Sequence, residues 1–349
     1  MDTCDIDTPF ALVDLDRLEA NIVKLQQYLD AHRIANRPHI KTHKIPEIAH
    51  MQLAAGAIGI TCQKLGEAEV MAQAGIRDMF LPYNLLGAAK MERLARLARR
   101  VNLSVTADNE IVVAGLSAAM TAANLTLAVL VECDTGGKRC GVQTPEQAAQ
   151  LARRIVGSPG LRFAGLMTYP SGPQTDPFVR ETKALLATSG IAVDRVSGGG
   201  TPGMWRAHET HEVTEYRAGT YVYGDRSQVN NGAMTLDECA LTVVATVISR
   251  PTEGRGILDA GSKALSSDMP GLDGYGMILE YPRARIYALS EEHGHVDFNA
   301  CARAPIIGER VTIVPNHVCV VSNLFNQVIG ARAGLVEVMW PVAARGLMQ

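Results

Sequence analysis

Residues 37–44 form a short basic segment that reads Arg37-Pro38-His39-Ile40-Lys41-Thr42-His43-Lys44. The pattern predicts a strand over residues 37–41, with Lys41 at its carboxyl end. In barrel enzymes that end of the strands carries the chemistry. A lysine amine forms an imine with an aldehyde when it is neutral part of the time, and burial beside other cations favours the neutral form. Taken alone, such a lysine-rich octapeptide is more often a basic surface loop.

On either side of this segment, short apolar runs alternate with helical patterns up to about residue 225. The predicted strands are 37–41, 58–62, 78–82, 101–106, 126–132, 162–169, 192–197 and 214–216. The predicted helices are 45–55, 66–74, 88–97, 110–122, 144–156 and 178–188. A strand about every 20 to 30 residues is typical of parallel βαβ units in an α/β fold. Eight such units predict a closed (β/α)8 barrel of the TIM type, and an open doubly wound sheet is the alternative.

The pattern changes after about residue 235. Strand-like runs at 241–249, 255–259, 283–289, 310–314 and 335–338 are separated by Gly, Pro and polar turns. This predicts a second, mostly antiparallel β domain. A strand at 10–14 precedes a helix at 16–31 and is expected to pair with that domain. The predicted division is therefore a barrel of residues 15–232 and a β domain of residues 1–14 plus 233–349.

Composition narrows the class of protein. The 349 residues are 47% hydrophobic and 20% charged with a net charge of −3, an ordinary globular balance. No basic stripe with interleaved aromatic residues indicates a nucleic-acid partner, and no apolar run is long enough for a membrane span. The acidic N-terminal residues do not resemble a signal peptide. Seven cysteines without paired spacing favour a reducing compartment, so we expect a cytoplasmic protein.

A glycine-rich segment follows the strand predicted at 192–197. It reads Ser197-Gly198-Gly199-Gly200-Thr201-Pro202. Glycines after a strand allow backbone N–H groups to approach an anion, and a following helix would direct its positive end there. Gly199, Gly200 and Thr201 are therefore candidates for binding a phosphate group, although tight turns use the same residues.

A possible pair of metal ligands lies near the end of the second domain, in the segment Pro315-Asn316-His317-Val318-Cys319. In an extended segment, residues two apart project to the same side, so His317 and Cys319 could hold one ion. An imidazole with a thiolate favours zinc over manganese. Glu292 and His293 could add to this site, but a solvated turn is the simpler interpretation. Core packing is the ordinary interpretation of an isolated His-x-Cys.

Segment 37–44, preceded by Asp7-Thr8-Pro9-Phe10-Ala11-Leu12-Val13-Asp14-Leu15-Asp16, resembles the D-threonine aldolase and D-serine dehydratase family. That family belongs to the fold-type III pyridoxal-phosphate enzymes, which share the alanine-racemase barrel. The resemblance extends from Thr8 to Val338 and implies that Lys41 carries pyridoxal 5'-phosphate. It also implies cofactor contacts from residues in the matching segments 132–142, 165–170 and 217–225 and beyond the second strand, namely Arg139, Tyr169, Tyr223 and Gln63. Arg139 would donate to the phenolic oxygen of the cofactor ring, because a guanidinium is a permanent planar donor.

The same resemblance implies a divalent metal (zinc, manganese or magnesium) on His317 and Cys319. It further implies a lyase acting on 3-hydroxy-D-amino acids, with a low-specificity D-threonine aldolase as the main hypothesis. A Cys in the position of Cys319 is prominent among the dehydratases, whereas segment 320–326 looks more like the aldolases. A D-serine or 3-hydroxy-D-aspartate dehydratase is therefore the alternative. An amino-acid racemase and a non-enzymatic cofactor carrier are further alternatives, and a homodimer is implied.

Overall fold

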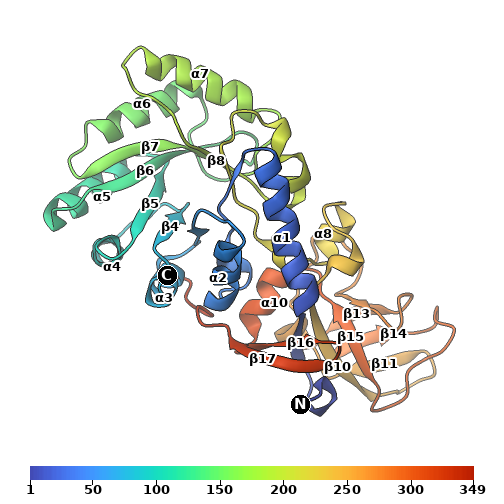
Figure 1. Ribbon diagram of the computed structural model, residues 1–349. Helices are drawn as coiled ribbons and strands as arrows, with labels where there is room; N and C mark the ends of the chain where they lie inside the picture. The colour runs from blue at the N-terminus through green and yellow to red at the C-terminus, as the bar shows by residue number, and fades with distance from the viewer. The chain divides into compact units, whose positions relative to one another are not determined.

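The computed structural model describes residues 1–349, and the chain divides into two compact units (Figure 1). The first, which we call the barrel unit, comprises Lys24–Lys41, Ile48–Gly219 and Leu347–Gln349. The second, the β unit, comprises Met1–Val23, Thr42–Glu47 and Thr220–Gly346. Residues 15–23, 42–47 and 220–232 thus belong to the β unit, whereas the sequence pattern assigns them to the barrel.

Eight parallel strands form the sheet of the barrel unit. In chain order they are β2 (Ala35–Asn36), β3 (Ile60–Thr61), β4 (Asp78–Leu81), β5 (Asn102–Ala107), β6 (Leu127–Cys133), β7 (Leu161–Thr168), β8 (Val196–Gly198) and β9 (Glu215–Tyr216). The order in the sheet is β2-β9-β8-β7-β6-β5-β4-β3. A parallel bridge between His39 and Thr61 then joins the two ends, with a hydrogen bond of 2.8 Å from Thr61 N to Pro38 O. The strands close on themselves, which confirms the barrel and excludes the open sheet.

Helices connect successive strands, as the periodicity predicts. They are α2 (Pro46–Ala54), α3 (Leu65–Gln73), α4 (Ala88–Ala98), α5 (Glu110–Ala123), α6 (Pro145–Val156) and α7 (Thr175–Ala187). Figure 1 shows α4 to α7 on the outer side of the strands that they connect. The longest helix, α1 (Leu15–Ala31), comes before β2. Between β8 and β9 the connection is a 3₁₀ helix, η3 (Thr201–Glu209), rather than an α-helix.

The first strand of the barrel differs from the prediction. Regular pairing ends at Asn36, and Ile40–Thr42 form a 3₁₀ turn, η2, that contains Lys41. The backbone still follows the neighbouring strand, because Arg37 N donates to Tyr216 O and His39 N to Ala218 O. Pro38 has no N–H to offer, so the ladder is interrupted there. Lys41 therefore lies in a turn three residues beyond this proline rather than at the end of a regular strand.

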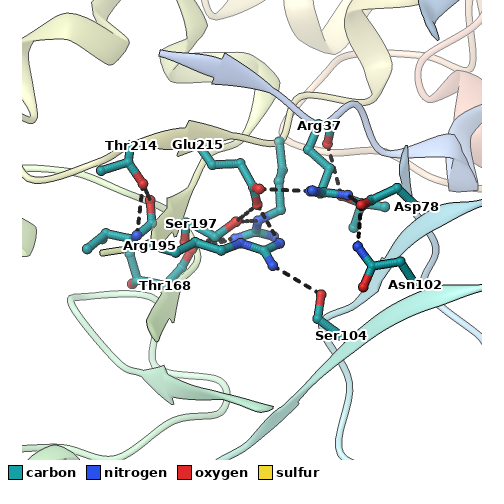
Figure 2. Close-up of polar contacts among 12 residues, drawn as sticks. Arg37, Asp78, Asn102, Ser104, Thr168, Arg195, Ser197, Thr214 and Glu215 are labelled. Carbon is teal, nitrogen blue, oxygen red and sulfur yellow. Dashed lines mark hydrogen bonds and ion pairs between the residues drawn. The ribbon is translucent and has the colours of Figure 1, made fainter. Parts of the chain in front are cut away.

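The barrel interior combines an apolar cluster with buried charges. Phe80, Leu130 and Met167 pack together. Beside them Glu215, 2% exposed, accepts from Arg37 Nε at 2.8 Å and from Arg195 Nη2 at 2.9 Å (Figure 2). Burial alone would raise the pKa of Glu215, but the two arginines outweigh it and hold the pKa below its usual value. The interior is thus crossed by a neutralised ionic network.

The β unit contains a nine-stranded sheet that is antiparallel except between β1 and β16. Its strands are β1 (Phe10–Asp14), β10 (Leu241–Ser249), β11 (Arg255–Leu258), β12 (Met277–Ile278), β13 (Arg285–Leu289), β14 (Gly294–Asp297), β15 (Arg310–Val314), β16 (Gln327–Arg332) and β17 (Leu335–Pro341). The predicted partnership of β1 with this domain is confirmed, since it pairs with both β10 and β16. Phe10, Val244 and Ile329 form the apolar cluster at this junction.

Short helices complete the β unit. They are η1 (Thr3–Asp5), η4 (Thr220–Val222), α8 (Arg226–Asn230), η5 (Leu236–Glu238), α9 (Ser262–Leu265) and α10 (Val318–Leu324). Helix α10 occupies part of a region that sequence reasoning treats as extended. Across the whole chain, none of the helices has both the length and the apolar character needed to cross a membrane.

Candidate active site

The turn that carries Lys41 is fixed by a chain of polar contacts within the barrel unit. His39 Nε2 lies 3.0 Å from Gln63 Oε1, and Lys41 N donates to His39 Nδ1 at 3.4 Å. These two contacts require the tautomer with its proton on Nε2. Gln63 is held in turn by Glu67, whose carboxylate accepts from Gln63 N at 2.7 Å. Sequence reasoning offers Gln63 as a cofactor contact, and here its amide oxygen faces His39.

The residues after Lys41 belong to the β unit, where α10 holds them. Lys44 Nζ donates to Asn323 Oδ1 at 2.9 Å, and Ser322 Oγ donates to the carbonyl of His43 at 3.4 Å. Arg37, in the barrel unit, is paired with Glu215 and Asp78. Two of the cations expected around Lys41, Arg37 and Lys44, are therefore engaged with other side chains.

Arg139 and Tyr169, both predicted from the family resemblance, lie together after the carboxyl ends of β6 and β7. The guanidinium carbon of Arg139 is 4.9 Å from the centroid of the Tyr169 ring, a cation–π distance. Both side chains are exposed in this unit. Tyr169 also lies close to Gly200, because a Cβ on Gly200 would come within 3.3 Å of the Tyr169 ring. Arg139, Tyr169 and the glycine segment thus form one continuous surface.

The glycine segment has the backbone that its sequence predicts. Gly199 and Gly200 have φ angles of 145° and 132°, which disfavour any residue with a Cβ. A Cβ on Gly199 would also meet Arg217 N at 2.6 Å. Gly200 is the N-cap of η3, and no side chain caps that end of the helix. Thr201 is buried, and its hydroxyl accepts from Gly219 N at 3.3 Å. The arrangement is suited to presenting backbone N–H groups to an anion.

Tyr223 is fully buried in the β unit. Burial raises the pKa of its hydroxyl strongly, and the buried hydroxyl oxygen has no hydrogen-bond partner within the chain. The ring meets His43 edge to face, with centroids 6.5 Å apart. The hydroxyl is consequently a neutral hydrogen-bonding group at any ordinary pH.

His317 and Cys319 are not in an extended segment, as the sequence argument assumes. His317 is the N-cap of α10, with φ −144° and ψ 100°, and Cys319 lies in its first turn. Cys319 is one of the groups that raise the pKa of His317, which fits a sulfur that accepts a hydrogen bond from the ring. The metal pair stays a prediction, and the start of a helix carries it rather than an extended segment.

The surroundings of this pair are polar. His317 Nδ1 lies 3.5 Å from Asp225 Oδ2. Asp225, followed by Cys319, raises the pKa of His317 to about 10. Cys319 Sγ is 3.2 Å from Thr42 Oγ1 and 3.6 Å from Thr220 Oγ1. A carboxylate therefore lies beside His317, and two threonine hydroxyls lie beside Cys319.

Glu292 and His293 do not extend the pair. Glu292 binds Lys263 Nζ at 2.7 Å on an exposed turn between β13 and β14. No group of three or more His, Cys, Asp or Glu side chains in residues 1–349 is arranged to hold a metal ion. The predicted metal ligands that the protein supplies are therefore two side chains, those of His317 and Cys319.

Sequence reasoning misses two buried charged residues near the carboxyl ends of the barrel strands. Glu132 is the next-to-last residue of β6 and is 4% exposed. Burial, with repulsion from Asp108, raises its pKa to about 7, although Arg139 and Arg217 oppose the shift. Arg217 donates from Nε to Ser197 Oγ at 2.8 Å and from Nη2 to Thr168 O at 2.7 Å. The sequence signal that could have found them is a charged residue within an apolar strand, as for Glu132, or directly after a strand, as for Arg217.

Comparison with known proteins assigns this arrangement to a family. The family model "Alanine racemase, N-terminal domain" matches residues 13–227, which include every strand of the barrel. The chain belongs to this family. A second model, "Putative serine dehydratase domain", matches residues 240–331 of the β unit. The match of both parts in this order agrees with the resemblance that the segment around Lys41 carries.

Individual relatives of this alanine racemase-like chain narrow the comparison. The D-threonine aldolase of an Arthrobacter species is 38% identical over 98% of this chain and 93% of its own length. The crystal structure of D-threonine aldolase from Filomicrobium marinum superposes with a TM-score of 0.92 at 34% identity, covering 99% of this chain and 97% of that one. A cysteine-to-alanine mutant of D-threo-3-hydroxyaspartate dehydratase, in the metal-free form, superposes with a TM-score of 0.88 at 29% identity, covering 98% of each chain.

Proposed function

We propose that this protein is a pyridoxal-phosphate- and metal-dependent lyase that cleaves 3-hydroxy-D-amino acids, with retro-aldol cleavage to glycine and an aldehyde as its main reaction. The observation that carries the proposal is the nearly full-length similarity to D-threonine aldolases, at 38% identity over 98% of the chain. The geometry adds a lysine held in a fixed turn, a glycine cradle and a His–Cys pair. Each of these supplies a different part of the chemistry.

The residues of the barrel unit fit the cofactor. A phosphate group requires close backbone approach, and Gly199 and Gly200 leave the space that a Cβ would fill. Thr201 follows them at the start of η3. Arg139 supplies a permanent cation beside Tyr169, suited to the phenolic oxygen of the ring. Lys41 would hold the cofactor covalently, and Gln63 would act through His39 rather than through a direct contact.

Tyr223 fits a phosphate contact by its chemistry. Its hydroxyl stays protonated because burial raises its pKa, so it remains a donor toward an anion. When bound, pyridoxal phosphate supplies an electron sink for the bond that breaks at the substrate's α-carbon. Lys41, once the substrate amine has replaced it, has a free amine that can accept or return a proton.

The donor set of the β unit fits a divalent ion. An imidazole and a thiol two residues apart favour zinc, while manganese and magnesium prefer oxygen ligands. Two protein ligands leave positions open for water and the substrate's 3-hydroxyl, which such an ion would acidify. His317 and Cys319 would hold it, so the pair would orient the hydroxyl end of the substrate.

A dehydratase is the second candidate, and Cys319 is the observation that favours it. D-threo-3-hydroxyaspartate dehydratase matches 98% of this chain in a form where a cysteine is replaced and metal is absent. In that reaction the α-proton leaves first and the 3-hydroxyl follows, giving a 2-oxo acid and ammonia. Both reactions need the same lysine, cofactor and metal pair, and they differ in which bond at the α-carbon breaks.

Product analysis separates the candidates. The cofactor-loaded protein is incubated with D-threonine and with D-serine, with zinc, manganese or magnesium and with a chelator. We expect glycine and acetaldehyde from D-threonine, only when metal is present. Release of 2-oxobutyrate or pyruvate with ammonia would instead establish the dehydratase. Chelator-independent interconversion of D- and L-amino acids would establish a racemase, and no turnover with any of these substrates would indicate a cofactor carrier.

Assembly and location complete the proposal. The family resemblance favours a homodimer, which sedimentation of the purified protein would test against a monomer. None of the seven cysteines forms a disulfide, which supports a reducing compartment such as the cytoplasm. The substrate is a small molecule, and neither nucleic acid nor a membrane is proposed as a partner.

A further inference from the structure

The imidazole of His317 is in contact with a buried carboxylate that comes from a distant part of the chain. Asp225 is 0% exposed, and its Oδ2 lies 3.5 Å from His317 Nδ1. A side chain this deeply buried keeps one orientation only if its oxygens are satisfied by fixed partners. The neighbours of Asp225 therefore decide whether it can control the imidazole.

Both oxygens of Asp225 are fixed by backbone donors. Oδ1 accepts from Gln228 N at 2.9 Å, and this bond caps the start of α8. Oδ2 accepts from Val318 N at 3.1 Å, and this bond caps the start of α10. The oxygen that faces His317 is thus anchored by the residue next to His317 itself. Because α10 begins at that point, the carboxylate is bonded to the same helix end that carries the imidazole.

A carboxylate can only accept a hydrogen bond, so the ring nitrogen that faces it must carry a hydrogen. In the neutral imidazole that metal binding requires, the remaining proton then stays on Nδ1, and the lone pair of Nε2 is available to an ion. Metal-binding histidines ordinarily donate their second N–H to a carboxylate or carbonyl, which fixes the tautomer and strengthens the ligand. We propose that Asp225 is the positioning residue that selects Nε2 of His317 as the metal ligand. The inference rests on the proposed metal site and adds to it a residue that sets the site's affinity.

Cys319 has an equivalent support. The hydroxyls of Thr42 and Thr220 lie 3.2 Å and 3.6 Å from its sulfur. Toward a thiolate, a hydroxyl acts as the donor, which stabilises the charged form that binds metal. Thr42 and Thr220 both belong to the β unit, as Cys319 does.

A purely structural role for Asp225 makes a different prediction, because capping two helices stabilises the fold without involving metal. The chain contains a matched control. Asp176, in the barrel unit, accepts from the backbone of His211 and Glu212 at 3.0 Å each and lies 3.2 Å from His211 Nδ1. It has the same kinds of partners as Asp225, with Arg180 in addition at 3.3 Å, but lies beside no candidate metal ligand.

The experiment measures zinc affinity of the cofactor-loaded, metal-free protein by competition with a chromophoric chelator. Wild type, Asp225→Asn, Asp176→Asn and His317→Ala are compared, and thermal unfolding without metal is recorded for each. We expect Asp225→Asn to weaken zinc binding by about 10- to 100-fold, as loss of such a partner does elsewhere. Asp176→Asn should leave zinc affinity unchanged, even if its stability falls as much.

Outcomes distinguish this inference from the function on which it rests. If His317→Ala abolishes zinc binding while Asp225→Asn does not weaken it, the positioning role is wrong and the metal site stands. If wild type binds no zinc, or binds it equally without His317, the metal site and this inference both fail. Nitrogen-15 NMR of histidine-labelled, zinc-loaded wild type covers the case of a variant that does not fold. A proton on Nδ1 of His317 is expected, and a proton on Nε2 would overturn the proposal.

Discussion

Two buried carboxylates, Glu215 in the barrel unit and Asp225 in the β unit, are neutralised in different ways. Glu215 binds two arginines, Arg37 and Arg195, at 2.8 and 2.9 Å (Figure 2). Asp225 instead binds two backbone N–H groups and the ring of His317. A guanidinium keeps its charge at any pH, whereas an imidazole can exchange its proton for a metal.

The charge of Glu215 is therefore suited to a structural role, and the charge of Asp225 to a functional one. The partners of Glu215 are permanent cations inside the barrel, so its charge is always compensated and no ligand is needed. Asp225 is compensated partly by a group whose other ring nitrogen is available to an ion. Since metal binding requires a neutral imidazole, the proton on Nε2 of His317 competes with metal for this site.

The largest stability effect is expected at Glu215. Glu215→Gln leaves buried Arg37 with Asp78 alone and partly buried Arg195 without a carboxylate, and breaking a buried pair in this way costs about 3–5 kcal/mol. Denaturant unfolding of the metal-free protein measures the loss, and zinc affinity should stay at the wild-type value. If the variant is as stable as wild type, or if it loses zinc affinity, Glu215 does not have the purely structural role that distinguishes it from Asp225.

A smaller, pH-dependent effect is expected at Glu132, a buried carboxylate whose pKa is raised to about 7 from an ordinary 4.5. Between these pH values the folded protein retains a proton that the unfolded chain has lost. The free energy of unfolding therefore falls as pH rises through that window, by at most about 3 kcal/mol. Unfolding of wild type and Glu132→Gln from pH 4 to 8 checks this. The variant should show a flatter profile, and parallel profiles would contradict the assignment.

Much of the fold is predictable from local pattern. The alternation of strands and helices predicts the barrel, and the glycines at 199 and 200 have the positive φ angles that their sequence suggests. The pattern does not predict the turn at Lys41, because Pro38 interrupts the ladder while leaving the path of the chain unchanged. Strands β12, β14 and β16 are also missed; β12 pairs with the distant β15, whereas β14 and β16 form local hairpins with β13 and β17.

The candidate site residues come from the sequence, but their geometry does not. His317 and Cys319 are suggested by their residue types and by the family resemblance, whereas the start of α10 between them depends on Asp225, 93 residues from Val318. The sequence Asp225-Arg226-Ser227-Gln228 does indicate a helix N-cap. Nothing local indicates that the same carboxylate reaches His317. Likewise, Glu215 lies in β9 and its two arginines lie next to β2 and β8, so only the pairing of β9 with both of those strands brings the three residues together.

The role of Lys41 is tested most directly by reducing the cofactor-loaded protein with borohydride and mapping the modified peptide. We predict one pyridoxyl adduct, on Lys41 in the peptide that contains residues 37–44, and no adduct in Lys41→Ala. An adduct on another lysine, or none despite bound cofactor, would contradict the account.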